Sequence, residues 1–222
     1  MGYAGGKGRI YQRLLNMMPP HTTYVETHLG GGAVMRNKRP AVRQIGIEID
    51  PVVFKRWSEA KKTPCELICG DAVAWLEQSD LELSALIYAD PPYVRATRRR
   101  CRVYRYDYTD VDHIRLLECL KRQKCMVMVS GYRNDIYDEM LNGWQRASFM
   151  AMTHAGMREE FVWFNFNPPQ QLHDARHLGD GYRQREIIKR RMARLRRRVS
   201  DLSRIEQFYL LEWLRAELGG IA

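Results

Sequence analysis

Short apolar runs alternate with longer amphipathic stretches along most of the chain, and this alternation is typical of a parallel sheet flanked by helices. The apolar runs predict strands near residues 23–27, 44–49, 66–69, 84–89, 125–130, 145–151 and 160–165. Helical periodicity falls between them, near residues 8–17, 51–60, 72–78, 110–122 and 133–141. We therefore expect an α/β fold with a seven-stranded, mostly parallel sheet.

The pattern changes after Pro168-Pro169, because such a pair continues neither a helix nor a central strand. A heptad-like apolar stripe and a capping-box pattern at Ser203-x-x-Glu206 then predict two helices, about 182–199 and 203–218. We divide the chain into a main domain, residues 1–169, and a basic helical extension, residues 170–222. The extension can be a solvated hairpin or a nucleic-acid-binding element.

Composition excludes several classes of protein. The 222 residues are 45% hydrophobic and 28% charged, without the run of roughly 18 apolar residues that a membrane span needs. The start of the chain lacks the apolar core of a secretory signal, so we expect a cytoplasmic protein. The five cysteines form no Cys-x-x-Cys pair, and His173 and His177 have no evident third ligand, so we expect reduced thiols and no metal site.

The formal net charge of +10 is unevenly distributed. The extension holds 12 of the 36 Lys and Arg residues but only 7 of the 26 acidic ones. A second basic cluster interleaves arginines with tyrosines in Arg95, Arg98, Arg99, Arg100, Arg102, Tyr104, Arg105, Tyr106 and Tyr108. Arginines neutralise phosphates or read guanine edges, and tyrosines stack on bases. The two clusters predict a polyanionic partner, although a solvated loop would give the same pattern.

The strongest local signal is Asp90-Pro91-Pro92-Tyr93, directly after an apolar run typical of a central strand. An exocyclic amino group on a planar ring is a poor nucleophile, because its lone pair is delocalised. Asp90 and the carbonyl of Pro91 would accept its hydrogens and draw the nitrogen toward tetrahedral geometry, and two prolines hold those acceptors rigidly. Tyr93 would stack on a base rotated out of a duplex.

Three earlier strands also end in glycine or acidic residues, at the edge where open α/β sheets bind ligands. The first runs into Glu26 and a loop with Gly30 and Gly32, the second ends at Glu48, and the third ends at Asp71-Ala72. Glycines let a ligand approach the backbone, and Glu48 stands where a ribose acceptor is usual. A nicotinamide dinucleotide would suit this pattern, but the third glycine of its fingerprint is missing.

In this order, the motifs resemble the DNA N6-adenine methyltransferases of the DNA adenine methylase type, especially the short phage and restriction–modification forms. The resemblance covers residues 3–165 and implies a Rossmann-like S-adenosylmethionine-dependent methyltransferase acting on double-stranded DNA in a bacterial or phage-infected cell. It implies that the cofactor is bound by Tyr3, Gly6, Lys7, Glu26, Gly30, Gly32, Glu48, Asp71, Ala72 and Asp90, and that catalysis uses Asp90, Pro91, Pro92 and Tyr93. Ser130-Gly-Tyr132 and the segment from Arg158 to Asn165 are similar to later, less specific motifs.

Two departures from the family pattern change the expectations. Thr27-His28 replaces the usual Pro-Phe pair after the acid, which alters how the methionine end of the cofactor is packed. Only 18 residues separate Asp71 from Asp90, so the target-recognition region that the classical enzymes insert there is missing. We therefore expect the arginine-tyrosine segment to contact DNA, with the C-terminal helices as a second candidate.

Other functions fit the same motifs. RNA adenine or cytosine N4 methylation would use this fold and chemistry, although cytosine enzymes usually resemble Ser-Pro-Pro-Tyr. A non-catalytic nucleic-acid-binding relic of the fold is a third reading. The chain is either a monomer or a homodimer through its C-terminal helices.

Overall fold

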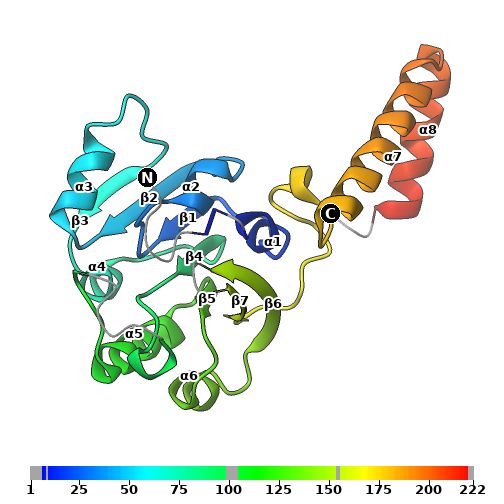
Figure 1. Cartoon of the computed structure of the whole chain (residues 1–222). Helices are drawn as coiled ribbons and strands as arrows, with labels where there is room; N and C mark the ends of the chain where they lie inside the picture. The colour runs from blue at the N-terminus through cyan, green and yellow to red at the C-terminus, as the bar shows by residue number, and fades with distance from the viewer. Residues whose placement is uncertain (1–6, 9, 99–104, 154–155, 220–222) are drawn as a thin grey trace. The chain divides into compact units, whose positions relative to one another are not determined.

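One seven-stranded sheet forms the centre of the main domain, as predicted (Figure 1). The computed structural model describes residues 7–8, 10–98, 105–153 and 156–219. The strand order is β3-β2-β1-β4-β5-β7-β6. Strands β1 to β5 pair in parallel, whereas β7 pairs antiparallel with β5 and β6. The bounds are β1 Thr23–Glu26, β2 Arg43–Glu48, β3 Glu66–Cys69, β4 Ala85–Ala89, β5 Met126–Gly131, β6 Gln145–Thr153 and β7 Gly156–Phe164.

This mostly parallel sheet confirms the predicted Rossmann-like methyltransferase fold, and every predicted strand is present within a few residues. The predicted helices are present too, with short 3-10 turns at Arg95–Thr97 and Ala175–His177. Their bounds are α1 Tyr11–Leu15, α3 Pro51–Ser58, α4 Ala72–Gln78, α5 Asp110–Arg122, α6 Asp135–Met140, α7 Tyr182–Ser200 and α8 Arg204–Leu218. A further short helix, α2 Ala33–Asn37, lies outside the predicted helical ranges.

The chain divides into two compact units, residues 1–11 with 20–168 and residues 12–19 with 169–222. The division after Pro168 lies where the composition changes, but residues 12–19 belong to the second unit and not to the main domain. Hydrogen bonds explain the difference. The Asn16 amide donates to the carbonyls of His177 (2.8 Å) and Gly179 (3.3 Å), and the His173 amide donates to the Met18 carbonyl (3.0 Å).

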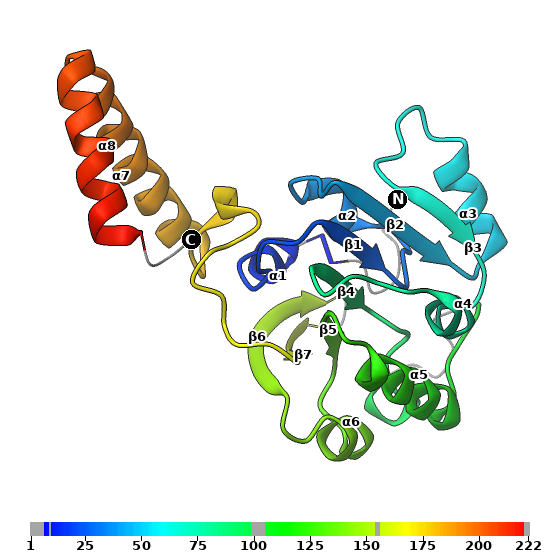
Figure 2. The ribbon, with the colours of Figure 1, turned by 180° about the vertical axis from the view of Figure 1, so that it is seen from behind.

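The core of the first unit lies between one face of the sheet and helices α4, α5 and α6 (Figures 1 and 2). Helix α3 contacts β2 and β3 from the other side. Every residue of β4 is buried, as its continuous apolar run predicts for a central strand. Side-chain caps fix where the helices begin: Asp50 caps α3, Asp71 caps α4, and Thr109 forms a capping box with Asp112 at α5.

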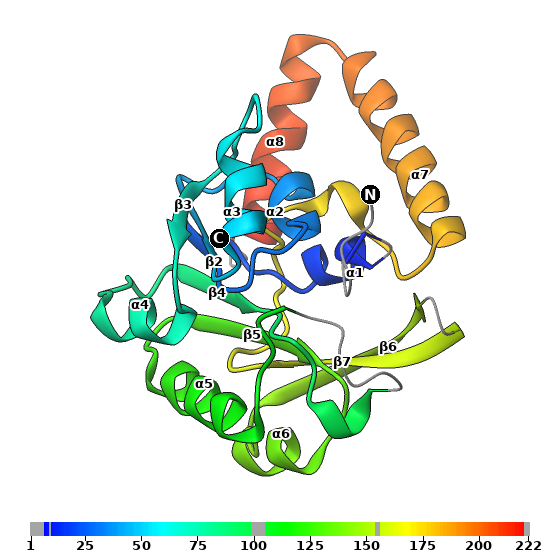
Figure 3. The same cartoon turned by 60° about the vertical axis from the view of Figure 1, so that its left-hand side comes forward.

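Helices α7 and α8 follow each other across a short turn at residues 201–203 (Figure 3). Neither contains a buried residue. Within the described part of the chain, no helix combines the length and apolar composition needed to cross a membrane.

The order of the strands reverses between β1 and β4. The chain runs from β1 outward through β2 to β3, and then returns to place β4 on the other side of β1. Loops that leave the carboxyl ends of β1 and β4 therefore diverge, and a ligand crevice forms between them.

Gly32 is essential to the loop between β1 and α2. Its φ is +59°, and an added Cβ would lie 2.2 Å from a ring carbon of Trp57. The Trp57 ring cannot easily shift, because its indole N–H donates to the carbonyl of Gly30 (2.8 Å) and Arg36 lies 3.7 Å over its ring.

We expect Gly32→Ala to lower the free energy of unfolding by about 2–5 kcal/mol, combining left-handed strain with overpacking. Urea unfolding measures the change. Gly70→Ala is the matched control, because a Cβ at Gly70 meets nothing within 4 Å. Equal unfolding midpoints for the two variants would contradict the assigned role of Gly32.

Candidate active site

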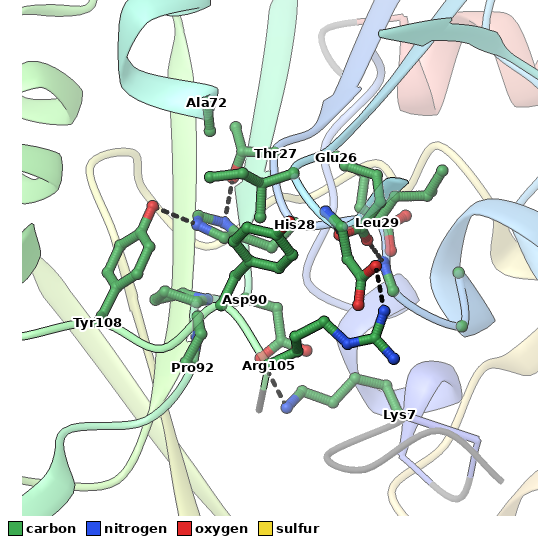
Figure 4. Close-up of a pocket in the computed structure, with 18 of the residues that line it drawn as sticks. Lys7, Glu26, Thr27, His28, Leu29, Ala72, Asp90, Pro92, Arg105 and Tyr108 are labelled. Carbon is green, nitrogen blue, oxygen red and sulfur yellow. Dashed lines mark hydrogen bonds and ion pairs between the residues drawn. The ribbon is translucent and has the colours of Figure 1, made fainter. Parts of the chain in front are cut away.

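A pocket opens at the carboxyl ends of β1, β2 and β4 and encloses about 810 Å³, measured out to its open mouth (Figure 4). Its walls come from the segment after β1, the ends of β2 and β3, the residues after β4, and two parts far from them in sequence, Lys7 and residues 105–108. The charged lining residues are Lys7, Glu26, Glu48, Asp50, Asp90 and Arg105.

The glycine loop after β1 is shaped by a buried acid on the neighbouring strand. Glu48 accepts the amide hydrogen of Gly30 at 2.8 Å through one oxygen and that of Asp50 at 2.8 Å through the other. Gly30 and Gly32 both have positive φ, which only glycine adopts without strain. Burial raises the pKa of Glu48, and these two amides partly offset that effect. Glu48 therefore fixes the loop backbone while it lines the pocket.

Glu26 lies at the end of β1 and is almost fully buried. One of its oxygens accepts from the Met35 amide (3.0 Å) and from the hydroxyl of Tyr24 (3.1 Å). Burial raises the pKa of Glu26 to about 8, the nearby charge of Asp90 adds to the rise, and the two hydrogen bonds oppose it. Without a cationic ligand, Glu26 is thus mostly protonated at neutral pH.

Asp90 follows β4 and is held by two donors on one oxygen. The hydroxyl of Ser130, on β5, donates at 2.7 Å, and the ammonium of Lys7 lies 2.8 Å away. The Ser130 hydroxyl also lies 3.0 Å from that of Tyr88. Adjacent parallel strands therefore fix the orientation of this carboxylate, which Figure 4 shows facing Lys7.

Lys7 is only 4% exposed and has a second acid beside it, since Glu160 Oε2 on β7 lies 3.5 Å from its nitrogen. Burial alone lowers the pKa of Lys7, but the charges of Asp90 and Glu160 outweigh burial and raise it above its ordinary value. The same ammonium donates to the hydroxyl of Tyr93 and lies 4.7 Å from the centre of that ring. Lys7 thus covers the acid and the aromatic ring of the Asp90–Tyr93 motif together.

An aromatic column forms another wall. The His28 ring lies edge-on to Tyr108 and its Nε2 is 2.9 Å from the tyrosine hydroxyl (Figure 4). Tyr108 is in turn edge-on to His113, whose Nδ1 lies 3.1 Å from the hydroxyl of Tyr137. Burial, helped by the nearby His113, lowers the pKa of His28 to about 3. A neutral imidazole therefore occupies the position at which the DNA adenine methylases that the motifs resemble have an aromatic residue.

Most of the predicted site residues come together. The pocket contains eleven of them: Lys7, Glu26, Gly30, Gly32, Glu48, Ala72, Asp90, Pro91, Pro92, Arg105 and Tyr106. Tyr3 and Gly6 lie outside the described residues.

Two predicted residues lie elsewhere. Asp71 does not line the pocket, because its carboxylate caps α4 through the Ala74 amide (2.8 Å) and pairs with Arg115 (3.2 Å). Its neighbours Gly70 and Ala72 form the wall instead. Tyr93 is buried beside the pocket, edge-on to Tyr132 at a ring distance of 4.3 Å, and not in its wall.

The arginine-tyrosine segment divides into parts with different positions. Arg105 and Tyr106 line the pocket, and Arg105 lies 3.4 Å from Asp50. Arg95 is exposed. Arg98 is not, because its side chain is 5% exposed, donates to both oxygens of Asp107 (2.9 and 2.6 Å) and also donates to the carbonyl of Tyr93. The prediction that Arg98 contacts DNA is therefore replaced by a structural role. Four other predicted residues lie outside the described part: Arg99, Arg100, Arg102 and Tyr104.

Sequence reasoning assigned no role to several residues in or beside the pocket: Asp50, Tyr108, Ser130 and Glu160. Ser130 does carry a signal, because it is a polar residue near the end of an otherwise apolar strand. His28 carries no such signal, because its aromatic role depends on Tyr108, 80 residues away.

No protein-family model and no curated protein matches the sequence. Solved structures similar to this chain include an rRNA methylase from Streptococcus thermophilus (11% identity, TM-score 0.48, 70% of this chain and 94% of that one). Others are the O-methyltransferase TomG from Streptomyces achromogenes in complex with SAM (17%, 0.47, 72% and 80%) and a putative O-methyltransferase from Klebsiella pneumoniae (13%, 0.49, 74% and 82%). The strand order itself establishes the fold.

The Arg98–Asp107 ion pair is largely buried, so its removal has a predictable cost. We expect Arg98→Ala to lower the free energy of unfolding by about 2–4 kcal/mol, because it leaves a largely buried carboxylate without its main partner. Arg95→Ala is the control, since Arg95 is exposed and lies 3.3 Å from the same Asp107. It should cost less than about 1 kcal/mol. Urea unfolding of both variants measures the difference, and equal costs would exclude a structural role for Arg98.

Proposed function

We propose that the chain is an S-adenosylmethionine-dependent methyltransferase that methylates the N6 amino group of adenine in DNA. The observation that carries the proposal is the fixed Asp90 carboxylate, which ends a buried central strand at the edge of an acid-lined pocket. Its orientation by Ser130 and Lys7 is the preorganisation that stabilisation of a transition state requires.

The pocket fits the cofactor by charge. Four acids and two basic residues are among its lining side chains, an excess that favours a positively charged ligand. S-adenosylmethionine carries a sulfonium and an ammonium against one carboxylate and is thus a net cation, whereas a nicotinamide dinucleotide would bring two phosphate charges. The buried Glu26, mostly neutral without a ligand, regains its charge when a cation lies beside it.

Different residues of the pocket are assigned to different parts of the cofactor. Glu26 and the glycine loop would hold the methionine end, on the side of the pocket that the neutral His28 ring also lines. Glu48 accepts the ribose hydroxyls, because a carboxylate offers about four acceptor sites and the two backbone amides leave some of them. Gly70 and Ala72 flank the adenine ring. When bound, the cofactor supplies an electrophilic methyl group.

Asp90 and the carbonyl of Pro91 accept the two hydrogens of the target amino group. These hydrogen bonds would draw the nitrogen lone pair out of the ring, so that it could bond to the methyl carbon while the bond from that carbon to sulfur breaks and the electron pair stays on the departing thioether. The Asp90 carboxylate then accepts the surplus proton from the methylated nitrogen. Pro91 and Pro92 keep both acceptors in place.

In the structure, the Lys7 ammonium occupies the position on Asp90 that we assign to the adenine amino group. Its ammonium is a nitrogen donor on Asp90 and lies over Tyr93, so an entering base must displace it from both. Glu160, 3.5 Å from that ammonium, keeps the charge paired after displacement. Tyr93 then offers a ring face for stacking on the flipped base.

DNA recognition is assigned to the segment that follows the catalytic motif. Helix α4 and strand β4 occupy the interval in which the classical enzymes insert a recognition region. Arg105 and Tyr106 link the 95–108 segment to the rim of the pocket. The net charge of +10 supports a polyanionic substrate.

The direct test is incubation with S-adenosylmethionine and unmethylated plasmid DNA, followed by sequencing that detects modified bases. We expect N6-methyladenine within a short motif and a loss of at least about 100-fold in rate for Asp90→Ala, because one preorganised catalytic acceptor contributes about that much. Asp80→Ala, an exposed acid after α4, is the control and should retain activity.

Other outcomes would assign a different function. Methylation of RNA alone, or of cytosine, would replace the proposed substrate while keeping the fold. Activity that persists in Asp90→Ala would exclude the proposed mechanism. Failure of the intact protein to bind the cofactor would identify a non-catalytic relic.

Glu26 makes cofactor binding depend on pH. Its pKa of about 8 in the free protein means that a cationic cofactor must expel a proton from it at neutral pH. The affinity of the wild type relative to Glu26→Gln should therefore rise between pH 6 and 8, by at most about tenfold per pH unit, and level off above pH 8. Calorimetry in buffers of different ionisation enthalpy measures both affinity and proton release. The cofactor's own titration affects both proteins equally, so it cancels in the ratio of wild-type to Glu26→Gln affinity. A ratio that stays constant between pH 6 and 8 would contradict the role of Glu26.

A further inference from the structure

Helix α8 is apolar on two opposite sides. One side carries Gln207, Leu210, Leu211, Leu214 and Leu218, and Gln207 on this side donates to the carbonyls of Val199 and Leu202 at 3.1 Å. The opposite side carries Ile205, Phe208, Tyr209 and Trp213, which we call the outer stripe, with Glu212 and Ala216 between them. A helix that is apolar on opposite sides is normally covered on both.

Within the described residues, the outer stripe is uncovered. Its four side chains are 53–83% exposed, and neither α7 nor α8 contains a buried residue. The helix itself is well specified, because Ser203 and Glu206 form a complete capping box at its start. A defined helix with an exposed aromatic stripe indicates an interaction surface and not a solvated tail.

The size of the surface fits a second protein. A fully exposed aromatic side chain presents about 150–250 Å², so Phe208, Tyr209 and Trp213 together present roughly 300–450 Å² at their observed exposure. Ile205, 83% exposed, adds to it. A standard interface takes about 800 Å² from each partner, so the stripe would supply the apolar centre of such an interface and the surrounding polar residues the rest.

The arrangement of the stripe fits a second copy of this chain. Ile205 and Trp213 stand four residues before and four residues after Tyr209, so these three positions coincide again when the direction of the helix is reversed. Two such stripes match when they run antiparallel about a two-fold axis at Tyr209, as an isologous dimer requires.

Charge favours the same partner. Helix α7 has nine Lys and Arg residues and one Glu, whereas α8 has two Arg and three Glu. Contact between two α8 helices therefore joins nearly neutral surfaces and leaves the basic helices free for a polyanion. A nucleic acid would bind α7 and leave the apolar stripe exposed.

We propose that the outer stripe of α8 is the interface of a homodimer, in which the two hairpins associate as an antiparallel four-helix arrangement centred on Tyr209. The proposal concerns the second unit alone and does not depend on the enzymatic activity.

Sedimentation analysis of the full chain tests the dimer. At about 10 µM we expect a mass twice the chain mass of 26.1 kDa. Phe208→Glu combined with Trp213→Glu should halve that mass. Glu217→Lys, off the stripe, should leave the dimer intact. A monomeric wild type, or a double variant that remains dimeric, would overturn the proposal. So would binding of a monomeric protein to anionic lipid vesicles through the stripe.

Cysteine cross-linking tests the geometry in a protein that keeps the rest of its surface. Tyr209→Cys should form a disulfide-linked dimer on mild oxidation, because the two copies of residue 209 meet at the axis. Ile205→Cys should not, since its partner is Trp213 of the second copy, while the chain with both Ile205→Cys and Trp213→Cys should cross-link. Cross-linking of Ile205→Cys alone, or none for Tyr209→Cys beyond that of the wild type, would exclude the antiparallel interface.

Discussion

The parallel pairing of β1 with β4 is the constraint from which the site follows. Four consecutive pairs, from Thr23↔Ala85 to Glu26↔Tyr88, hold the two strands in register. Because both strands point the same way, Glu26 and Asp90 emerge at one edge of the sheet. The order of the strands reverses there, so the loops that follow diverge and leave room for a ligand. The closeness of the two acids also adds to the rise in the pKa of Glu26 that burial begins.

Buried charge comes at a cost that the surrounding groups must offset. Burying a lysine alone would cost several kcal/mol, and Lys7 is stabilised only because Asp90 and Glu160 lie within 3.5 Å of its nitrogen. Apolar residues of similar volume would often stabilise a fold equally well. In the proposed reaction the cluster has a further purpose: Lys7 would neutralise Asp90 until a substrate nitrogen replaced it, and Glu160 would then pair with the displaced ammonium.

The sequence was informative where a local pattern determines the structure. A continuous apolar run places β4 in the centre of the sheet and so places Asp90 at its edge. The glycines after Glu26 indicate a loop that only positive φ can form, and the structure has such angles at Gly30 and Gly32. The capping-box pattern at Ser203 likewise marks the start of α8. In each case neighbours in sequence make the decisive interaction.

Misplaced residues depend on partners far away or on competing local uses. Asp71 ends a strand like Glu48, but it also precedes a helix, and capping α4 takes its carboxylate away from the pocket. Arg98 looks like its neighbours in a basic run, yet Asp107 and the Tyr93 carbonyl bind it. From the sequence, His28 indicates that an aromatic residue has been lost, but in the structure its ring packs edge-on against Tyr108. Composition cannot show the Arg98–Asp107 and His28–Tyr108 pairings, because both depend on where folding places residues 107 and 108.

The two proposed substrates have opposite charge, and the chain separates the groups that would attract them. The cationic cofactor needs acids, and four of them line the pocket with only Lys7 and Arg105 as basic residues. The polyanion needs arginines, and these are concentrated in the segment after the catalytic motif and along α7. A basic group deep in the pocket would repel the cofactor unless it were neutralised, and Lys7 is neutralised by two acids. The ion pairs with Asp90 and Glu160 that stabilise the buried Lys7 thus also prevent its charge from repelling the proposed cationic cofactor. For this reason a lysine is compatible with the position at which the proposed target base would enter.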